Sequence, residues 1–99
     1  METTAILEAI LFVAEEPLTT EELAQILEIS RDTVTKELGS LAQRLAERQS
    51  GLVLRQLGGG WRLYTHPEAR PYAQRFASSP AGSRLSPAAL ETLAVVAYR

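Results

Sequence analysis

A triple glycine, Gly58-Gly59-Gly60, is the feature of this sequence that most constrains its fold. It separates two short segments that read as strands, 52–57 and 61–64, and glycine supplies the positive backbone φ that a tight hairpin turn needs. Three segments with helical spacing of apolar residues precede this hairpin. The order of helix, helix, long helix and hairpin predicts a winged helix-turn-helix domain, which is mainly α with a small β-hairpin.

The helices have recognisable starts. We expect the first helix over residues 3–14. Thr19 followed by Glu22 has the spacing of a capping box, which predicts the start of the second helix. Ser30 is the predicted N-cap of a long third helix over 31–49. Only a tight turn separates the second helix from the third, as in helix-turn-helix proteins.

Composition excludes several functional classes. The 99 residues accommodate one small domain, and no apolar run approaches the roughly 20 residues that cross a bilayer. No secretion signal begins the chain, so we expect a cytoplasmic protein. The absence of cysteine excludes disulfides and thiolate chemistry. Because His66 is the one histidine and no nucleophile has a base beside it, we expect no catalytic residue, no cofactor and no metal site. His66 is expected to cap a turn or lie at the surface.

Charge is distributed unevenly along the chain. Residues 1–30 carry seven acids and no base, whereas residues 31–99 carry ten bases and five acids. Such a division is typical either of a nucleic-acid face or of two protein-docking faces of opposite sign. The candidate contacts with DNA or an acidic partner are Arg31, Lys36, Arg55 and Arg62. Acidic residues on the same turns of the third helix leave it at only +1, which is a weak DNA signal.

The first helix carries more apolar residues than one small core requires. Its excess is explained either by packing inside the domain or by contact with a second copy of the chain. We also expect Tyr72 and Phe76, four residues apart on a later helix, to close the core. The candidate dimer-interface residues, from the first and last helices, are Ile6, Leu7, Ile10, Leu11, Leu90 and Leu93.

Residues 78–99 differ from the rest of the sequence in composition, because a linker-like segment precedes one further helix. Residues 78–85 have the Ser, Pro and Gly content of a linker, and Ser86 is placed to cap a further helix. We therefore expect a winged-helix domain over 1–77 and, over 86–99, the first helix of a truncated second winged-helix domain. The apolar face of that helix must fold back, pair between subunits or fray.

A series of motifs runs through the chain in a characteristic order. They are Leu7-Glu8-Ala9-Ile10-Leu11-Phe12-Val13, Glu16-Pro17-Leu18, Gly59-Gly60-Trp61-Arg62-Leu63, Pro67-Glu68, Pro71-Tyr72, Leu85-Ser86, Ala89-Leu90-Glu91-Thr92-Leu93-Ala94 and Ala97-Tyr98-Arg99. In this order, and over nearly the whole chain, they resemble the segregation and condensation protein B family. The chain departs from that family by lacking the second winged helix.

The resemblance implies a non-catalytic scaffold in chromosome condensation and partition, associated with the nucleoid. Members of that family are homodimers that join a kleisin subunit (ScpA) and, through it, the ATPase head of a bacterial structural-maintenance-of-chromosomes (SMC) complex. The resemblance also implies that DNA association is indirect or weak and that the second domain provides most of the kleisin contact. The residues alone leave open an alternative, a DNA-binding winged-helix transcriptional regulator.

Overall fold

The computed structural model describes the backbone of residues 1–97 and the side chains of residues 1–93. Its elements form a winged helix-turn-helix domain, which confirms the predicted fold class. Residues 98–99 of the predicted segment 86–99 lie outside the described residues. The elements are α1 (Thr3–Val13), β1 (Leu18–Thr19), α2 (Thr20–Leu27), α3 (Arg31–Glu47), β2 (Leu52–Leu57), β3 (Gly60–Thr65), α4 (Arg70–Ser78), the 3₁₀ helix η1 (Pro80–Arg84) and α5 (Pro87–Ala97).

The helix starts are where the sequence predicts them. The Thr19 hydroxyl accepts a hydrogen bond from the Glu22 amide at 3.1 Å, and the Glu22 carboxylate accepts one from the Thr19 amide at 2.9 Å. This reciprocal pair is the predicted capping box. The Ser30 hydroxyl accepts from the Thr33 amide at 3.1 Å and caps α3. Between these caps, Glu28 ends α2 in the left-handed conformation, with φ 57°, and so forms the tight turn.

The hairpin is extended by a third strand. β3 is the central strand, with β2 on one side and the two-residue β1 on the other, and all pairs are antiparallel. Gly58 and Gly59 form the turn with φ of 58° and 83°, as predicted. Gly60 has a different role, because a Cβ there would lie 2.5 Å from the Cβ of Pro17. β1 was not predicted, since two residues are too few to show alternation.

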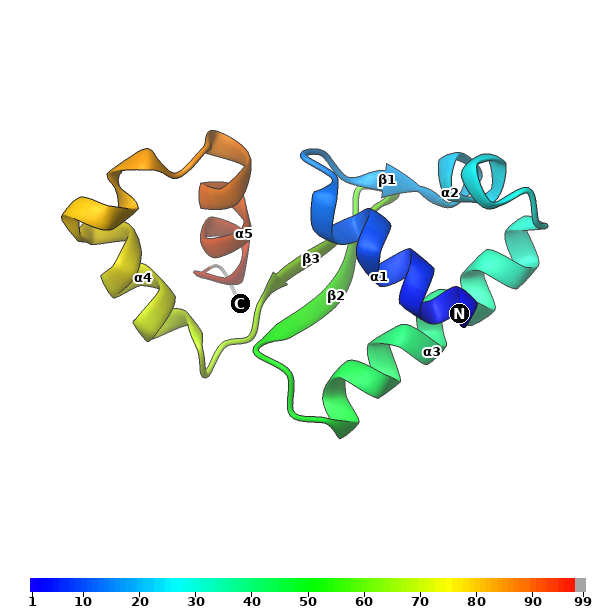
Figure 1. Ribbon diagram of the computed structural model, residues 1–99, viewed down its shortest axis with the longest axis horizontal. Helices are drawn as coiled ribbons and strands as arrows, with labels where there is room; N and C mark the ends of the chain where they lie inside the picture. Colours follow the sequence, from blue (N-terminus) through cyan, green and yellow to red (C-terminus); the bar gives the residue numbers. More distant parts are fainter. Residues whose placement is uncertain (98–99) are drawn as a thin grey trace.

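Helices α1, α2 and α3 lie on one side of the sheet and form the main core with it, while α4 and α5 lie on the other side (Figure 1). Leu54 and Leu63, opposite each other on β2 and β3, are the sheet's buried residues in that core, and Leu18, Leu52 and Trp61 pack against it. The fully or nearly fully buried core residues are Leu7, Leu11, Leu23, Val34, Leu38, Leu41, Leu45, Leu54 and Leu63.

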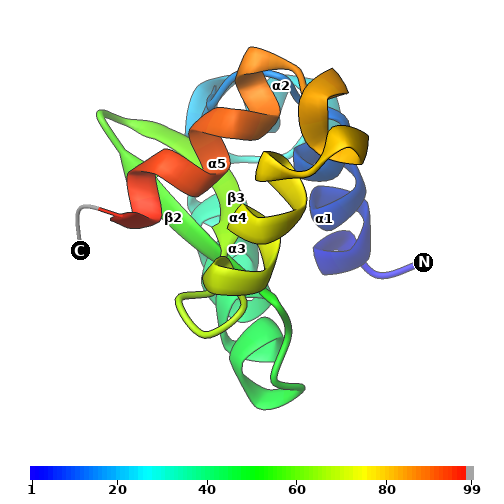
Figure 2. The ribbon, with the colours of Figure 1, turned by 90° about the vertical axis from the view of Figure 1, so that its left-hand side faces the viewer.

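The second face of the sheet is covered by α5, which also contacts α4 (Figure 2). Tyr64 on β3 is 2% exposed and Leu93 on α5 is buried. Of the three outcomes considered for the last helix, folding back is the one observed. Ser86 caps it as predicted, accepting from the Ala89 amide at 3.2 Å.

Two expectations for the intervening segment need correction. Tyr72 and Phe76 do not close the core; both are exposed on α4, because α5 takes the place over the sheet that they were expected to fill. Residues 80–84, within the predicted linker, form η1 and pack closely on α4. That packing requires glycine at position 82, where a Cβ would lie 2.1 Å from the carbonyl oxygen of Phe76. Within residues 1–97, none of the helices combines the length and apolarity that a membrane span requires.

Candidate protein-docking surfaces

The C-terminal half of α1 presents large apolar side chains to solvent. Phe12 is 76% exposed and Val13 is 72% exposed. Leu7 and Leu11, by contrast, are 0% and 4% exposed and belong to the core of the domain itself. The helical period explains the division, because Thr4, Leu7 and Leu11 recur on the buried face while Phe12 and Val13 fall outside it.

The exposed side of α1 borders two shallow apolar hollows. One, of about 250 Å³, lies between α1 and the sheet and is lined by Ala5, Glu8, Ala9, Phe12, Leu52 and Leu63. The other, of about 310 Å³, lies between the end of α1 and the start of α5, where Phe12 and Val13 face Ala88 and Ala89. Phe12, Leu52 and Leu63 line both hollows, so the two adjoin each other beside the exposed ring of Phe12.

The predicted dimer-interface residues are therefore distributed differently from the expectation. Leu7 and Leu11 offer almost no surface to a partner, and Leu93 is buried where α5 packs on the sheet; as surface contacts these three predictions are corrected. Ile6 and Ile10 are partly buried, and Ile10 packs against the core. Leu90 is 45% exposed and remains available. Phe12 and Val13 were not among the predicted interface residues. The position of Phe12 outside the apolar stripe of the first helix was a sequence signal that it is exposed.

Ion pairs within the domain join three of the seven N-terminal acids to three arginines that follow in the sequence. Glu2, the N-cap of α1, pairs with Arg44 of α3. Glu8 of α1 pairs with Arg48, the C-cap of α3, at 2.9 Å. Between α2 and α3, Glu21 pairs with Arg31 at 3.0 Å. The acidic N-terminal segment thus lies against basic residues of α3. No separate acidic and basic face arises from these six residues.

The same pairs shift the acid–base equilibria of their members. The hydrogen bond from Arg44 lowers the pKa of the Glu2 carboxyl below its ordinary value of 4.5, and the carboxylate in turn raises the pKa of Arg44. The pKa of Glu21 is lowered by a backbone hydrogen bond and by a hydrogen bond from Arg31. Each carboxylate is thus held in its charged form beside its arginine.

Arg62 is not a surface residue. It was expected on the hairpin as a contact for DNA or an acidic partner, yet it is 6% exposed. Its guanidinium donates to the Glu91 carboxylate of α5 at 2.7 Å and to the backbone carbonyl of Glu15 after α1. The prediction is corrected for a physical reason: α5 folds back over this face of the sheet and encloses the side chain.

The remaining two basic candidates lie on different elements of the fold. Lys36 is exposed on the first half of α3, and Arg55 is partly buried on β2. Neither makes an ion pair within the described part of the chain. Of the four predicted basic contacts, Arg31 is paired and Arg62 is buried, so the structure does not assemble the four into one patch.

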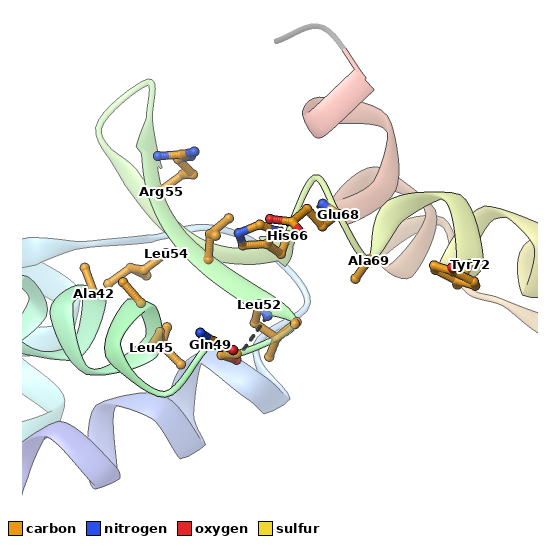
Figure 3. A pocket seen from close by; sticks show the side chains of 14 residues that line it. Ala42, Leu45, Gln49, Leu52, Leu54, Arg55, His66, Glu68, Ala69 and Tyr72 are labelled. Atoms are coloured by element: carbon orange, nitrogen blue, oxygen red, sulfur yellow. Dashed lines mark hydrogen bonds between the residues drawn. The ribbon is translucent and has the colours of Figure 1, made fainter.

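A third hollow lies along β2 (Figure 3). It has a volume of about 700 Å³ and lies between the second half of α3 and the segment that leads into α4. Its apolar lining comes from Ala42 and Leu45 of α3 and from Leu52 and Leu54 of β2, with Tyr72 at the α4 end. Arg55, His66 and Glu68 provide its polar border.

His66 has a defined local role in that border. Its Nδ1 accepts a hydrogen bond from the Glu68 amide at 3.0 Å, which confirms the expected capping role. In the neutral imidazole the proton then resides on Nε2. The sequence did not indicate this hollow, called the β2 groove below, because it depends on how α4 is placed relative to α3.

Comparison with known proteins identifies close relatives. The family model for the segregation and condensation complex subunit ScpB matches residues 5–99. Segregation and condensation protein B of Desulforamulus reducens is 44% identical over 98 residues, which cover 99% of this chain and 54% of that relative. The protein of the same name from Halalkalibacterium halodurans is 44% identical over 96 residues, covering 96% of this chain and 49% of the relative. The chain thus spans about half the length of these curated relatives.

Solved structures agree with the sequence comparison. The crystal structure of ScpB from Mycobacterium tuberculosis matches with a TM-score of 0.73 at 42% identity, covering 97% of this chain and 60% of that one. A crystal structure of a dimer of the ScpB N-terminal domain complexed with a ScpA peptide matches with a TM-score of 0.69 at 32% identity. That match covers 74% of this chain and 91% of the other.

Proposed function

We propose, from the premise that this chain belongs to the segregation and condensation complex subunit ScpB family, that it acts as a scaffold in chromosome condensation and partition. In this role it is a non-catalytic accessory subunit of a bacterial SMC–kleisin complex, present in the cytoplasm at the nucleoid. Residues 1–77 form its N-terminal winged-helix domain, and residues 86–99 begin a second one after the segment 78–85.

The observation that carries this proposal is the contrast between charge and apolar surface. Three arginines that could have met phosphate are paired with or enclosed by groups of the chain itself, namely Arg31, Arg44 and Arg62. Phe12 and Val13 meanwhile remain exposed. Phosphate affinity depends on clustered free cations, whereas an exposed aromatic and aliphatic patch is typical of protein interfaces. This contrast favours a scaffold over the transcriptional regulator.

We further propose that the chain forms a homodimer through the exposed side of α1. The relative whose N-terminal domain was crystallised as a dimer with a ScpA peptide supports both a second copy and a kleisin as partners. In an isologous interface each patch meets itself, so Phe12 of both copies would be buried. Full burial of such a side chain contributes about 1.5–3 kcal/mol per residue.

Light scattering after size exclusion tests this interface. The unchanged chain is expected to have twice its 10.9 kDa mass. Phe12→Glu should give the monomer mass with an unchanged helical circular dichroism signal, because Phe12 is exposed and its removal leaves the core intact. Ile26→Glu, at an exposed apolar residue of α2, is the matched control and should remain dimeric. A Phe12→Glu protein that stays dimeric would remove α1 from the interface.

A further inference from the structure

The outer edge of β2 carries backbone groups without partners. The sheet order places β2 at an edge, paired with β3 alone. In an antiparallel pair, alternate residues direct both their N–H and C=O groups toward the neighbouring strand. The His66 amide donates to the Gly51 carbonyl at 2.7 Å, which sets this alternation. By the observed register, Val53 and Arg55 bond to β3, and Leu52, Leu54 and Gln56 point outward.

Most of these outward groups are unsatisfied within the described part of the chain. The Leu52 amide donates to the Ser50 hydroxyl at 3.0 Å. The Leu52 carbonyl and both backbone groups of Leu54 and Gln56 have no protein partner there. An exposed edge of this kind is a template for an added strand.

The groove in Figure 3 runs along this edge. Side chains from both faces of β2 line it, Leu52 and Leu54 from the core face and Val53 and Arg55 from the other. Because side chains from both faces of the sheet line the same hollow, the hollow lies beside the edge of β2 and not over one face of the sheet. An extended chain placed in it would therefore reach the unpaired backbone groups.

The residues that line the groove indicate which side chains an added strand would carry. Successive side chains of an added strand point to opposite faces. On one face they would meet Ala42 and Leu45 of α3, which favours apolar residues. On the other they would meet Arg55, which has no carboxylate partner within the described residues and favours an acidic residue. The Nε2 proton of neutral His66 is a further donor at that border.

We propose that the β2 edge binds an extended segment of the kleisin, which adds a strand to the sheet. The segment has apolar side chains alternating with polar ones, and a carboxylate among these pairs with Arg55. This inference rests on the proposed function, because the partner is the kleisin. Its support is the free edge, the groove beside it and the unpaired charge of Arg55.

Amide hydrogen exchange of the ¹⁵N-labelled chain with overlapping 15-residue peptides of its cognate kleisin tests the proposal. A peptide that binds should slow exchange of the Leu54 and Gln56 amides by about tenfold or more, since both gain acceptors. Binding that leaves these two amides unchanged would overturn the β2 site alone. If no peptide binds, the kleisin role in the proposed function fails together with the site.

Variants at the strand edge separate backbone pairing from side-chain effects. Gln56→Pro removes the outward N–H without removing a bond to β3, and should weaken peptide binding by about tenfold. Gln56→Thr keeps that N–H and should bind within about twofold of the unchanged chain. Arg55→Glu should also weaken binding by about tenfold, through repulsion of the peptide carboxylate.

Equal binding by all of these variants contradicts the proposal. If Gln56→Pro instead converts a dimer to monomers, the edge pairs with a second copy and the kleisin proposal is wrong.

Discussion

Gly39 and Gly60 show how differently two glycines can be constrained. Gly39 is exposed inside α3, and a Cβ there would meet nothing within 4 Å. Gly60 is buried at the start of β3, where a Cβ would lie 2.5 Å from Pro17. The first glycine costs helix stability because it is flexible in the unfolded chain, whereas the second allows β1 to approach β3.

We predict opposite effects from the same substitution at these two positions. Gly60→Ala should lower the free energy of unfolding by about 1–3 kcal/mol, because Pro17 and β1 must shift to admit a methyl group. Gly39→Ala should raise it by about 0.5–1 kcal/mol through helix propensity. Urea denaturation of both variants measures the two changes. A Gly60→Ala protein as stable as the unchanged chain would contradict the close approach of β1.

Residues whose role depends on neighbours in sequence were predictable, and those that depend on distant contacts were not. The Thr19 and Ser30 caps follow from spacing within four residues, and both predictions are confirmed. The burial of Arg62 could not be read from the hairpin, because α5, 25 residues later, encloses it. An arginine on a strand carries no local signal for such a contact.

At the scale of elements, the docking of α5 on the sheet organises the second face of the domain. Arg62 links three segments. It lies on β3 and donates hydrogen bonds to the Glu15 carbonyl, just after α1, and to the Glu91 carboxylate of α5. Helix α5 has no other ion pair to the rest of the described chain. We infer that this arginine holds α5 in place together with the burial of Leu93.

Replacing Arg62 tests that role. Arg62→Met should lower the free energy of unfolding by about 1–2 kcal/mol, since it leaves the Glu15 carbonyl without its donor and removes a charged hydrogen bond. Amides of α5 should exchange faster than those of α3 in this variant. Arg31→Met, at an exposed pair, is the matched control and should leave both measurements unchanged. Unaltered exchange in α5 for Arg62→Met would show that the helix is held by other contacts.

The elements themselves were predicted unevenly. Those with a repeating apolar pattern, α1, α3 and the hairpin, agree with the sequence to within about two residues at each end. The exposure of Tyr72 and Phe76 was not foreseen, because a pair spaced by four residues indicates a helical face but does not say what covers it. The groove along β2 was missed for a similar reason, as it is formed between elements.

At the scale of the whole molecule, the ion pairs inside the domain favour protein docking over DNA binding. Sequence showed acids in one part and bases in another, which left a DNA face possible. The fold brings Glu2, Glu8 and Glu21 onto arginines of α3 and its C-cap. The exposed side of α1 is apolar, and the groove along β2 has both apolar and polar lining residues. Both kinds of surface are typical of contacts with protein partners.

The most direct test of this account is fluorescence anisotropy of labelled duplex DNA titrated with the chain, at low salt and at near-physiological salt. We predict no saturable binding at near-physiological salt and at most weak binding at low salt, because the paired arginines offer few free cations to phosphate. Tight binding at near-physiological salt would contradict the account, above all if Lys36→Ala reduced the salt slope by about one unit. That result would make α3 a recognition helix and the chain a DNA-binding protein.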